Sequence, residues 1–372
     1  MKNFSLLVVA VLAGCSAASQ SPLLPAAPGG APAVPASPMS ESSDGNTCTR
    51  QTGQNTPRLN GSIARPPMGT CHEPPPAGKQ TPAPVGYLYV TNKTASGESQ
   101  LVVYRGLTGS APYRMIVKSV HDVGGMTVGH DGHVFVANGT QGNVLEFAPG
   151  ASSIVRTYSK GLSNPVDVAV TDNRLYVTDR GTAADGYAQQ IVEFSTTTGQ
   201  VSSVSAVGGL GAGATHNAGV AVNATSPATF FVSANSLSQP PLADRDCTGS
   251  TYTFAQNLFP TLWENVALDH NTQVAGVAFD ARDRLYAADP CANAVVVYEY
   301  KHYSWVYIRT IAVPVKMPMY LTVGNGYLAI PSTGSAANDS GYVTLVDIRN
   351  PAIVTTFNSG LTHPIGAGVG PP

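Results

Sequence analysis

The chain has 372 residues and a formal net charge of −2, and only 11% of its residues are charged. This balance excludes the basic surface that a nucleic-acid-binding protein requires, so no nucleic-acid partner is expected. The 38 Gly and 29 Pro, together with many short β-branched runs, favour strands joined by turns over helices.

The N-terminus predicts export. Phe4 to Leu12 is an apolar stretch of signal-peptide length, too short to span a bilayer as a permanent helix. It ends in Leu12-Ala13-Gly14-Cys15, which resembles the bacterial lipobox. The resemblance implies a signal peptide over residues 1–14 and lipidation of Cys15, whose acyl chains would anchor the protein to a membrane. The alternative is an ordinary secretory signal that is cleaved nearby, for instance after Ala18, with Cys15 lost.

The segment after the signal predicts a tether. Residues 15–84 are rich in Pro and Ala and hold few large apolar side chains, so they cannot offset the entropy of ordering. We therefore expect a lipidated Cys15 followed by a disordered tether. Ser16 follows the cysteine, and the absence of aspartate there favours the outer membrane if the source is a Gram-negative bacterium.

From residue 85 onward a short strand with a polar end recurs. The polar residues that end these strands are Asn92, Asn138, Asp179, Asn235, Asp289 and Ser332. Their spacing of 41 to 56 residues is typical of propeller blades. Runs of Gly, Ala and Val precede most of them, as expected of innermost strands that crowd around a channel.

The end of the chain supplies a strand that the first repeat lacks. His363 to Val369 would complete the first blade and leave no open sheet edge. We therefore expect an all-β fold, a single β-propeller over residues 85–372, with six four-stranded blades closed by the C-terminal strand. Seven blades are expected instead if residues 240–270 hide another.

Two motifs carry a family resemblance. Tyr89-Val90-Thr91-Asn92 is the tetrapeptide that names the YVTN repeats, and residues 276–298 resemble NHL-type blades. The resemblance covers roughly residues 85 to 370. It implies exported or surface propellers that mostly bind other molecules, although a few relatives are lactonases or lyases, and fold analogy cannot decide between these functions.

The predicted topology brings two polar columns to one face of the propeller. One column precedes the inner strands, and the other ends the second strands, where Asn and Asp also cap turns through nearby backbone amides. Long loops lie on the same face, which favours binding there. The candidate binding residues on this face are Asp122, Asn164, His216, Gln273, His363, Asp179 and Asp289.

A catalytic alternative uses three of these residues. Asp122, His216 and His363 could surround a zinc ion or act as acid and base. The resemblance to propeller enzymes fails in detail, because neither column holds the Glu of a lactonase calcium site and only two histidines match the three of an amidating lyase. No cofactor is expected, and Ca or Zn enters only under this alternative.

Four further cysteines predict disulfides in an exported chain. Three pairings are possible, and we favour Cys48–Cys71 and Cys247–Cys291, since the latter pair falls in corresponding loops of neighbouring blades. Metal binding by these cysteines is the weaker hypothesis, because the chain has no Cys-x-x-Cys motif. The apolar run from Phe254 to Trp263 is either a partner-contact patch or the outer strands of the fourth blade.

Together these features predict a lipoprotein of the cell envelope whose propeller is a non-catalytic binding or interaction module. Its partners would be a membrane, through the lipid, and an unidentified protein, small molecule or glycan. The alternatives are a lactonase- or lyase-like enzyme with a metal at the channel mouth, and a purely structural surface protein.

Overall fold

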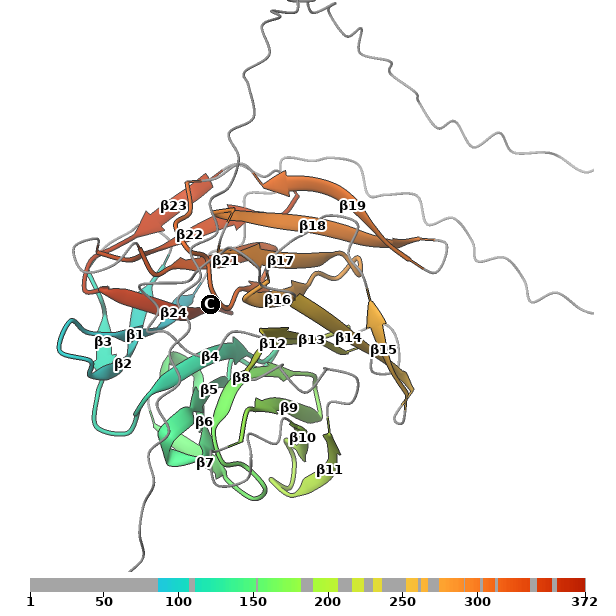
Figure 1. Ribbon diagram of the computed structural model, residues 1–372. Coiled ribbons are helices and arrows are strands. Elements are labelled where there is room, and N and C mark those ends of the chain that lie inside the picture. The colour runs from blue at the N-terminus through green and yellow to red at the C-terminus, as the bar shows by residue number, and fades with distance from the viewer. Residues whose placement is uncertain are drawn as a thin grey trace, which may run out of the picture. The chain divides into compact units, whose positions relative to one another are not determined.

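A computed structural model gives the fold (Figure 1). It describes residues 86–106, 111–151, 153–181, 190–206, 216–223, 230–235, 252–259, 262–266, 274–290, 292–301, 304–311, 314–334, 340–349 and 353–371. The chain divides into two units, Met1–Pro74 and Pro75–Pro372, and every described residue belongs to the second. The predicted signal peptide and tether lie outside the described residues, as do the five cysteines Cys15, Cys48, Cys71, Cys247 and Cys291.

Strand pairing builds a β-propeller, as the sequence predicts. Each sheet holds four antiparallel strands, and most sheets use four strands that are consecutive in the chain. From the inner to the outer strand, the sheets are β24 (His363–Gly370), β1 (Tyr87–Lys93), β2 (Ser99–Arg105) and β3 (Arg114–Ile116); β4 (Val123–Val128), β5 (Val134–Asn138), β6 (Asn143–Phe147) and β7 (Ile154–Tyr158); β8 (Pro165–Val170), β9 (Arg174–Asp179), β10 (Gln190–Ser195) and β11 (Val201–Ala206); β12 (His216–Val222), β13 (Phe230–Asn235), β14 (Tyr252–Phe259) and β15 (Leu262–Val266); β16 (Gly276–Phe279), β17 (Leu285–Asp289), β18 (Ala294–Lys301) and β19 (Ser304–Ile311); β20 (Thr322–Gly324), β21 (Tyr327–Ser332), β22 (Tyr342–Asp347) and β23 (Ile353–Phe357).

The structure corrects the expected blade count, because residues 240–270 do not form the seventh blade that the sequence left open. β14 and β15 lie in the poorly patterned stretch 240–270, and they pair with β13 and with each other. That stretch therefore completes the sheet that begins at β12, and the described strands form no seventh sheet. Side-chain packing is described for five of these six sheets, while the sheet of β12 to β15 is described mainly through its backbone.

The two ends of the described chain meet in one sheet. β24 pairs with β1 along its length, from Tyr87 opposite Gly370 to Lys93 opposite His363 (Figure 1). The C-terminal strand is thus the inner strand of the first blade, as expected. This pairing closes the ring of blades and satisfies the backbone groups that an inner sheet edge would leave open.

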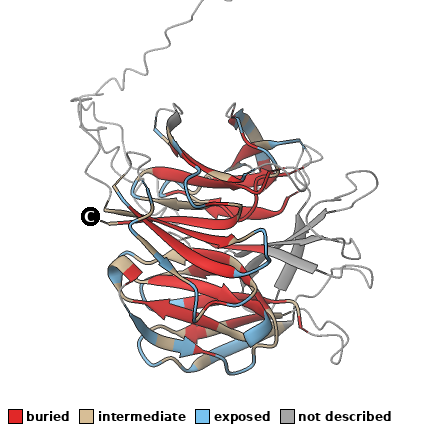
Figure 2. Cartoon of the chain, turned by 90° about the vertical axis from the view of Figure 1, so that its left-hand side faces the viewer, coloured by how far each residue is buried: buried red, intermediate tan, exposed pale blue. Residues whose placement is uncertain are grey.

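The hydrophobic core lies between the faces of neighbouring blades. Most strand residues are buried on both faces, whereas exposure is concentrated in turns and outer strands (Figure 2). Between β7 and β10 the rings of Tyr158 and Phe194 approach edge to face, with centroids 5.2 Å apart. Tyr104 of β2 and Phe357 of β23 lie 5.0 Å apart between the last and first blades. Apolar burial between the blades therefore holds successive sheets together.

Close approach of the inner strands explains their small residues. A Cβ placed on Gly276 of β16 would lie 2.7 Å from the Cα of Tyr320, which precedes β20. Backbone atoms cannot move aside as the end of a flexible side chain can, so only glycine fits at this contact. The small residues of the inner strands thus fix how tightly the blades close around the central channel.

Candidate functional site

The polar residues that end the second strands cap backbone turns. The side-chain oxygen of Asn92, at the end of β1, accepts hydrogen bonds from the amides of Thr362 and His363, both at 2.9 Å. Asn138, at the end of β5, accepts one from the amide of His121 at 2.5 Å. Each side chain therefore ties the end of a second strand to the segment that precedes the inner strand of its own blade.

Asp179, at the end of β9, repeats this arrangement with a carboxylate. Its two oxygens accept the amides of Ser163 at 2.8 Å and Asn164 at 2.6 Å. They also accept the Gly181 amide and the Gln190 side chain, each at 3.2 Å. The carboxylate is fully buried and occupied by these donors. In the fifth blade, Asp289 accepts the amide of Ala292 at 2.8 Å.

Asp122, the acid of the catalytic alternative, forms an ion pair. Lys93 Nζ lies 2.5 Å from Asp122 Oδ1, and Lys93 stands opposite His363 in the pairing of β1 with β24. His363 Nδ1 itself lies 3.4 Å from the carbonyl oxygen of Thr333. An ammonium group at this position competes with any cation for the Asp122 carboxylate.

Of the other candidate residues on this face, Asn164 is described with its side chain. The side-chain amide of Asn164, oriented with its oxygen towards Arg180, accepts hydrogen bonds from Arg180 Nε at 2.9 Å and Nη2 at 3.1 Å. Gln273 and the side chain of His216 lie outside the described residues. Among the side chains that are described, no three His, Cys, Asp or Glu lie together so that they could hold a metal ion.

A cavity of about 520 Å³ occupies the central channel and reaches the turns that follow the inner strands. This is the opposite end of the channel from the two polar columns. All the inner strands contribute to its wall, among them through Thr127, Val168, Val220, Val277, Thr322 and Val369. Its volume lies within the range of about 300–1,000 Å³ that small-molecule sites occupy, and its wall combines apolar with polar surface.

Asp167 of β8 is a buried acidic group in the wall of this cavity. Its residue is only 4% exposed, and Oδ2 accepts a hydrogen bond from the Val220 amide of β12 at 3.0 Å. Burial raises its pKa well above the usual value, although the backbone amides of Val220 and Val168 act in the opposite direction. Among the described side chains, no cation forms an ion pair with it.

Glycines of both neighbouring inner strands lie beside this carboxyl. A Cβ on Gly125 of β4 would fall on Oδ1 of Asp167, and one on Gly219 of β12 would lie 3.4 Å from Oδ2. The carboxyl therefore extends over both neighbouring inner strands. Its position depends on the absence of a side chain at residue 125, where a Cβ would clash with it.

The outer part of the cavity carries positive charge. Asp280 and Arg284 both line it and form a close ion pair, with Arg284 Nη2 and Nε at 2.6 Å and 2.7 Å from Asp280 Oδ2. Burial would raise the pKa of Asp280, but the hydrogen bonds from Arg284 outweigh it and hold that pKa below its usual value. Arg282 and Arg349 also line the cavity and are exposed. Arg349 is paired with Asp347, whereas no ion pair joins Arg282 to a described acid, so Arg282 adds positive charge near the mouth.

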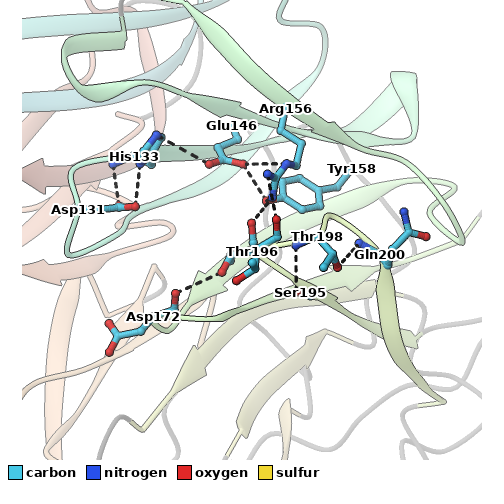
Figure 3. Close-up of polar contacts among 11 residues, drawn as sticks. Asp131, His133, Glu146, Arg156, Tyr158, Asp172, Ser195, Thr196, Thr198 and Gln200 are labelled. Carbon is cyan, nitrogen blue, oxygen red and sulfur yellow. Dashed lines mark hydrogen bonds and ion pairs between the residues drawn. The ribbon is translucent and has the colours of Figure 1, made fainter.

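A second polar cluster joins the blades of β4–β7 and β8–β11 (Figure 3). Buried Glu146 accepts a hydrogen bond from the Tyr158 hydroxyl at 2.8 Å, and His133 Nε2 lies 4.0 Å from its other oxygen. Arg156 donates to the carbonyl oxygens of Thr196 and Thr197 in the turn after β10. His133 is too far from Glu146 for a hydrogen bond. Because Arg156 contacts both its own blade and the turn after β10, the cluster holds the two blades together.

Sequence reasoning missed the residues of the cavity. Asp167 lies within an inner strand that the sequence predicts, and an aspartate among Val and Ala residues was the available signal. Arg282, Arg284 and Arg349 lie in turns that the repeat pattern treats as connections. The turns around the cavity are short, whereas the long loops, which favour binding sites, lie at the opposite end of the channel.

The described residues contain no helix long and apolar enough to cross a membrane. The sequence matches no protein-family model and no curated protein. Among solved structures, a chain in the crystal structure of a nidogen/laminin complex is similar, with a TM-score of 0.53 and 12% identity over 77% of this chain and 98% of that one. A Bacteroides caccae protein of unknown function has a TM-score of 0.54 and 10% identity over 77% of this chain and 99% of the other. These likenesses show the fold alone.

Proposed function

We propose that this chain is an exported lipoprotein whose propeller is a non-catalytic binding module, anchored to the cell envelope through Cys15. The observation that carries the binding part is the channel cavity of about 520 Å³. Its wall consists of hydrogen-bonded inner strands, which form a rigid container with both apolar and polar surface. Such a preformed cavity with a few polar groups is typical of sites for small organic ligands.

The contacts of the candidate catalytic residue Asp122 and of the candidate binding residue Asp179 favour binding over turnover. The Asp122 carboxylate is paired with Lys93, and that of Asp179 is occupied by backbone amides. A general base or a metal ligand needs an oxygen that is available to its substrate or metal. The described residues of this face therefore stabilise the fold, and none of them favours the lactonase- or lyase-like alternative.

Binding without turnover is tested by incubating the detergent-solubilised full chain with a defined mixture of metabolites and short glycans. Equilibrium dialysis followed by mass spectrometry then compares each compound with a heat-denatured control. We expect at least one compound to be retained and recovered unchanged. Depletion of a compound with appearance of its hydrolysis or elimination product would establish an enzyme instead.

The anchor is tested separately by Cys15→Ser, with Cys48→Ser as a matched cysteine control. We expect Cys15→Ser to move the protein from the membrane fraction to the soluble fraction, because two or more acyl chains would be lost. Cys48→Ser is expected to remain with the membrane. Retention of both variants on the membrane would overturn the lipid anchor and leave the binding function untouched.

A further inference from the structure

We propose that the channel cavity takes an elongated zwitterionic small molecule, with an amino group against Asp167 and a carboxylate or phosphate near Arg282 and Arg349. This inference rests on the proposed binding function and names the chemistry of its ligand. Three observations support it: the unpaired acid inside the wall, the depth of the cavity, and the positive charge at its outer part.

The first observation concerns Asp167. Buried acids in proteins are normally paired with a cation, and the buried acids Asp280 and Glu146 follow this rule through Arg284 and Arg156. Asp167 is 4% exposed and lines the cavity, yet no ion pair joins it to a described cation. The backbone amide of Val220 satisfies part of Oδ2 without supplying a counter-charge. An ammonium group of a ligand would supply that charge where water is largely excluded.

The second observation concerns distance. Asp167 and Thr171 both line the cavity and are four residues apart along β8 and its following turn. At a strand rise of about 3.3 Å per residue, they are about 13 Å apart. A ligand that spans this depth is a medium-length chain or a short peptide rather than a single amino acid. Its middle would contact the apolar wall of valines.

The third observation concerns the mouth. The Asp280–Arg284 pair is internally balanced, so the excess positive charge there comes from Arg282, beside the guanidinium group of Arg349. Arg349 has a weak contact with Asp347, whose Oδ1 lies 3.4 Å from its Nε. Positive charge at the mouth repels a ligand that is cationic at both ends. It attracts an anionic group, for which the guanidinium fork is well suited.

The test uses a set of straight-chain ω-amino acids from 6-aminohexanoate to 11-aminoundecanoate, measured by isothermal titration calorimetry on the full chain. Octanoate and octylamine are the matched probes, since each keeps the 8-aminooctanoate chain and lacks one charged end. We expect one ω-amino acid of intermediate length to bind best. Each one-ended probe is expected to bind at least about tenfold more weakly, because each loses one ionic contact.

Variants separate the two ends. Asp167→Asn keeps an oxygen that can accept the Val220 amide but removes the charge, so it is expected to weaken ω-amino acid binding about 100-fold without affecting octanoate. Arg282→Gln with Arg349→Gln is expected to weaken ω-amino acids and octanoate together, leaving octylamine unaffected. Asp172→Asn, on the adjacent exposed turn, is the control. Circular dichroism verifies the fold of each variant.

Unchanged binding in Asp167→Asn, or equal binding of octanoate and 8-aminooctanoate, would overturn the inference. Failure of the whole set to bind would also overturn it. The proposed function would then depend on the metabolite mixture: a retained neutral or anionic compound would leave a binding module with a different ligand. If no compound were retained, both the zwitterionic ligand and the proposed binding function would be wrong.

Discussion

The Asp167 carboxylate of β8 accepts a hydrogen bond from the Val220 amide of β12 at 3.0 Å, which joins the inner strands of two adjacent blades. The contact links residues that are 53 positions apart in the chain. It places an acidic group in the wall of the channel, where water has little access. The same carboxyl therefore serves the packing of the blades and sets the chemistry of the cavity.

Burial of Asp167 predicts a specific dependence of stability on pH. Its folded-state pKa is raised above 3.8, so the folded chain keeps this proton to a higher pH than the unfolded chain does. Below an unfolded pKa of about 3.9 both states bind the proton. As the pH rises from there through the raised folded pKa, the unfolded state loses its proton first, and the free energy of unfolding falls.

Asp167→Asn removes this titration and keeps an acceptor for Val220. We expect its melting temperature to exceed that of the wild type by a margin that grows between about pH 4 and the folded pKa, and then stays constant. Thermal denaturation followed by circular dichroism at a series of pH values measures the margin. The account is wrong about Asp167 if the two curves run parallel over the whole range.

Gly125 supplies the second prediction, because its Cβ position coincides with Oδ1 of Asp167. Gly125→Ala is expected to lower the free energy of unfolding by about 2–3 kcal/mol through overpacking. In a chain that already carries Asp167→Ala, the same change is expected to cost less by about 1 kcal/mol or more, because the clashing oxygen is gone. Urea denaturation of the four chains completes the double-mutant cycle, and equal costs in both backgrounds would contradict the contact.

Asp179 supplies the third prediction. Asp179→Ala leaves the amides of Ser163 and Asn164 without their acceptor, so we expect a loss of about 2–3 kcal/mol in the free energy of unfolding. Asp179→Asn keeps one acceptor oxygen and is expected to lose less. Asp172→Ala, at an exposed turn, is the matched control and should stay within about 0.5 kcal/mol of the wild type. If Asp179→Ala lowered the free energy of unfolding as little as Asp172→Ala does, the turn-capping role of Asp179 would be wrong.

Local pattern predicted much of the fold. The Gly-, Ala- and Val-rich inner strands and the closing strand His363–Gly370 could be predicted because each has a local signature of small residues before a polar-ended strand. The number of blades could not be predicted, because the stretch Tyr252–Val266 has no such signature. Only its strand pairing shows that it belongs to the sheet of β12.

The candidate site was harder to predict. Asn92 and Asp179 could be interpreted as turn caps because their partners lie within their own blade. The environment of Asp167 could not be inferred, because Gly125 and Val220 are distant in sequence and meet it only when the inner strands close around the channel. A buried acid in a strand of small residues was visible in the sequence, but its cavity was not.

The most direct test of the account is whether closing the channel abolishes binding. Thr127 of β4 lines the cavity, while Thr157 of β7 is exposed on the outer strand of the same blade. Thr127→Trp would fill the channel, and Thr157→Trp adds the same side chain away from it. Calorimetric titration with the best-binding ω-amino acid is predicted to show no binding to Thr127→Trp and wild-type affinity in Thr157→Trp. Wild-type affinity in a correctly folded Thr127→Trp variant would place the ligand elsewhere and contradict the account.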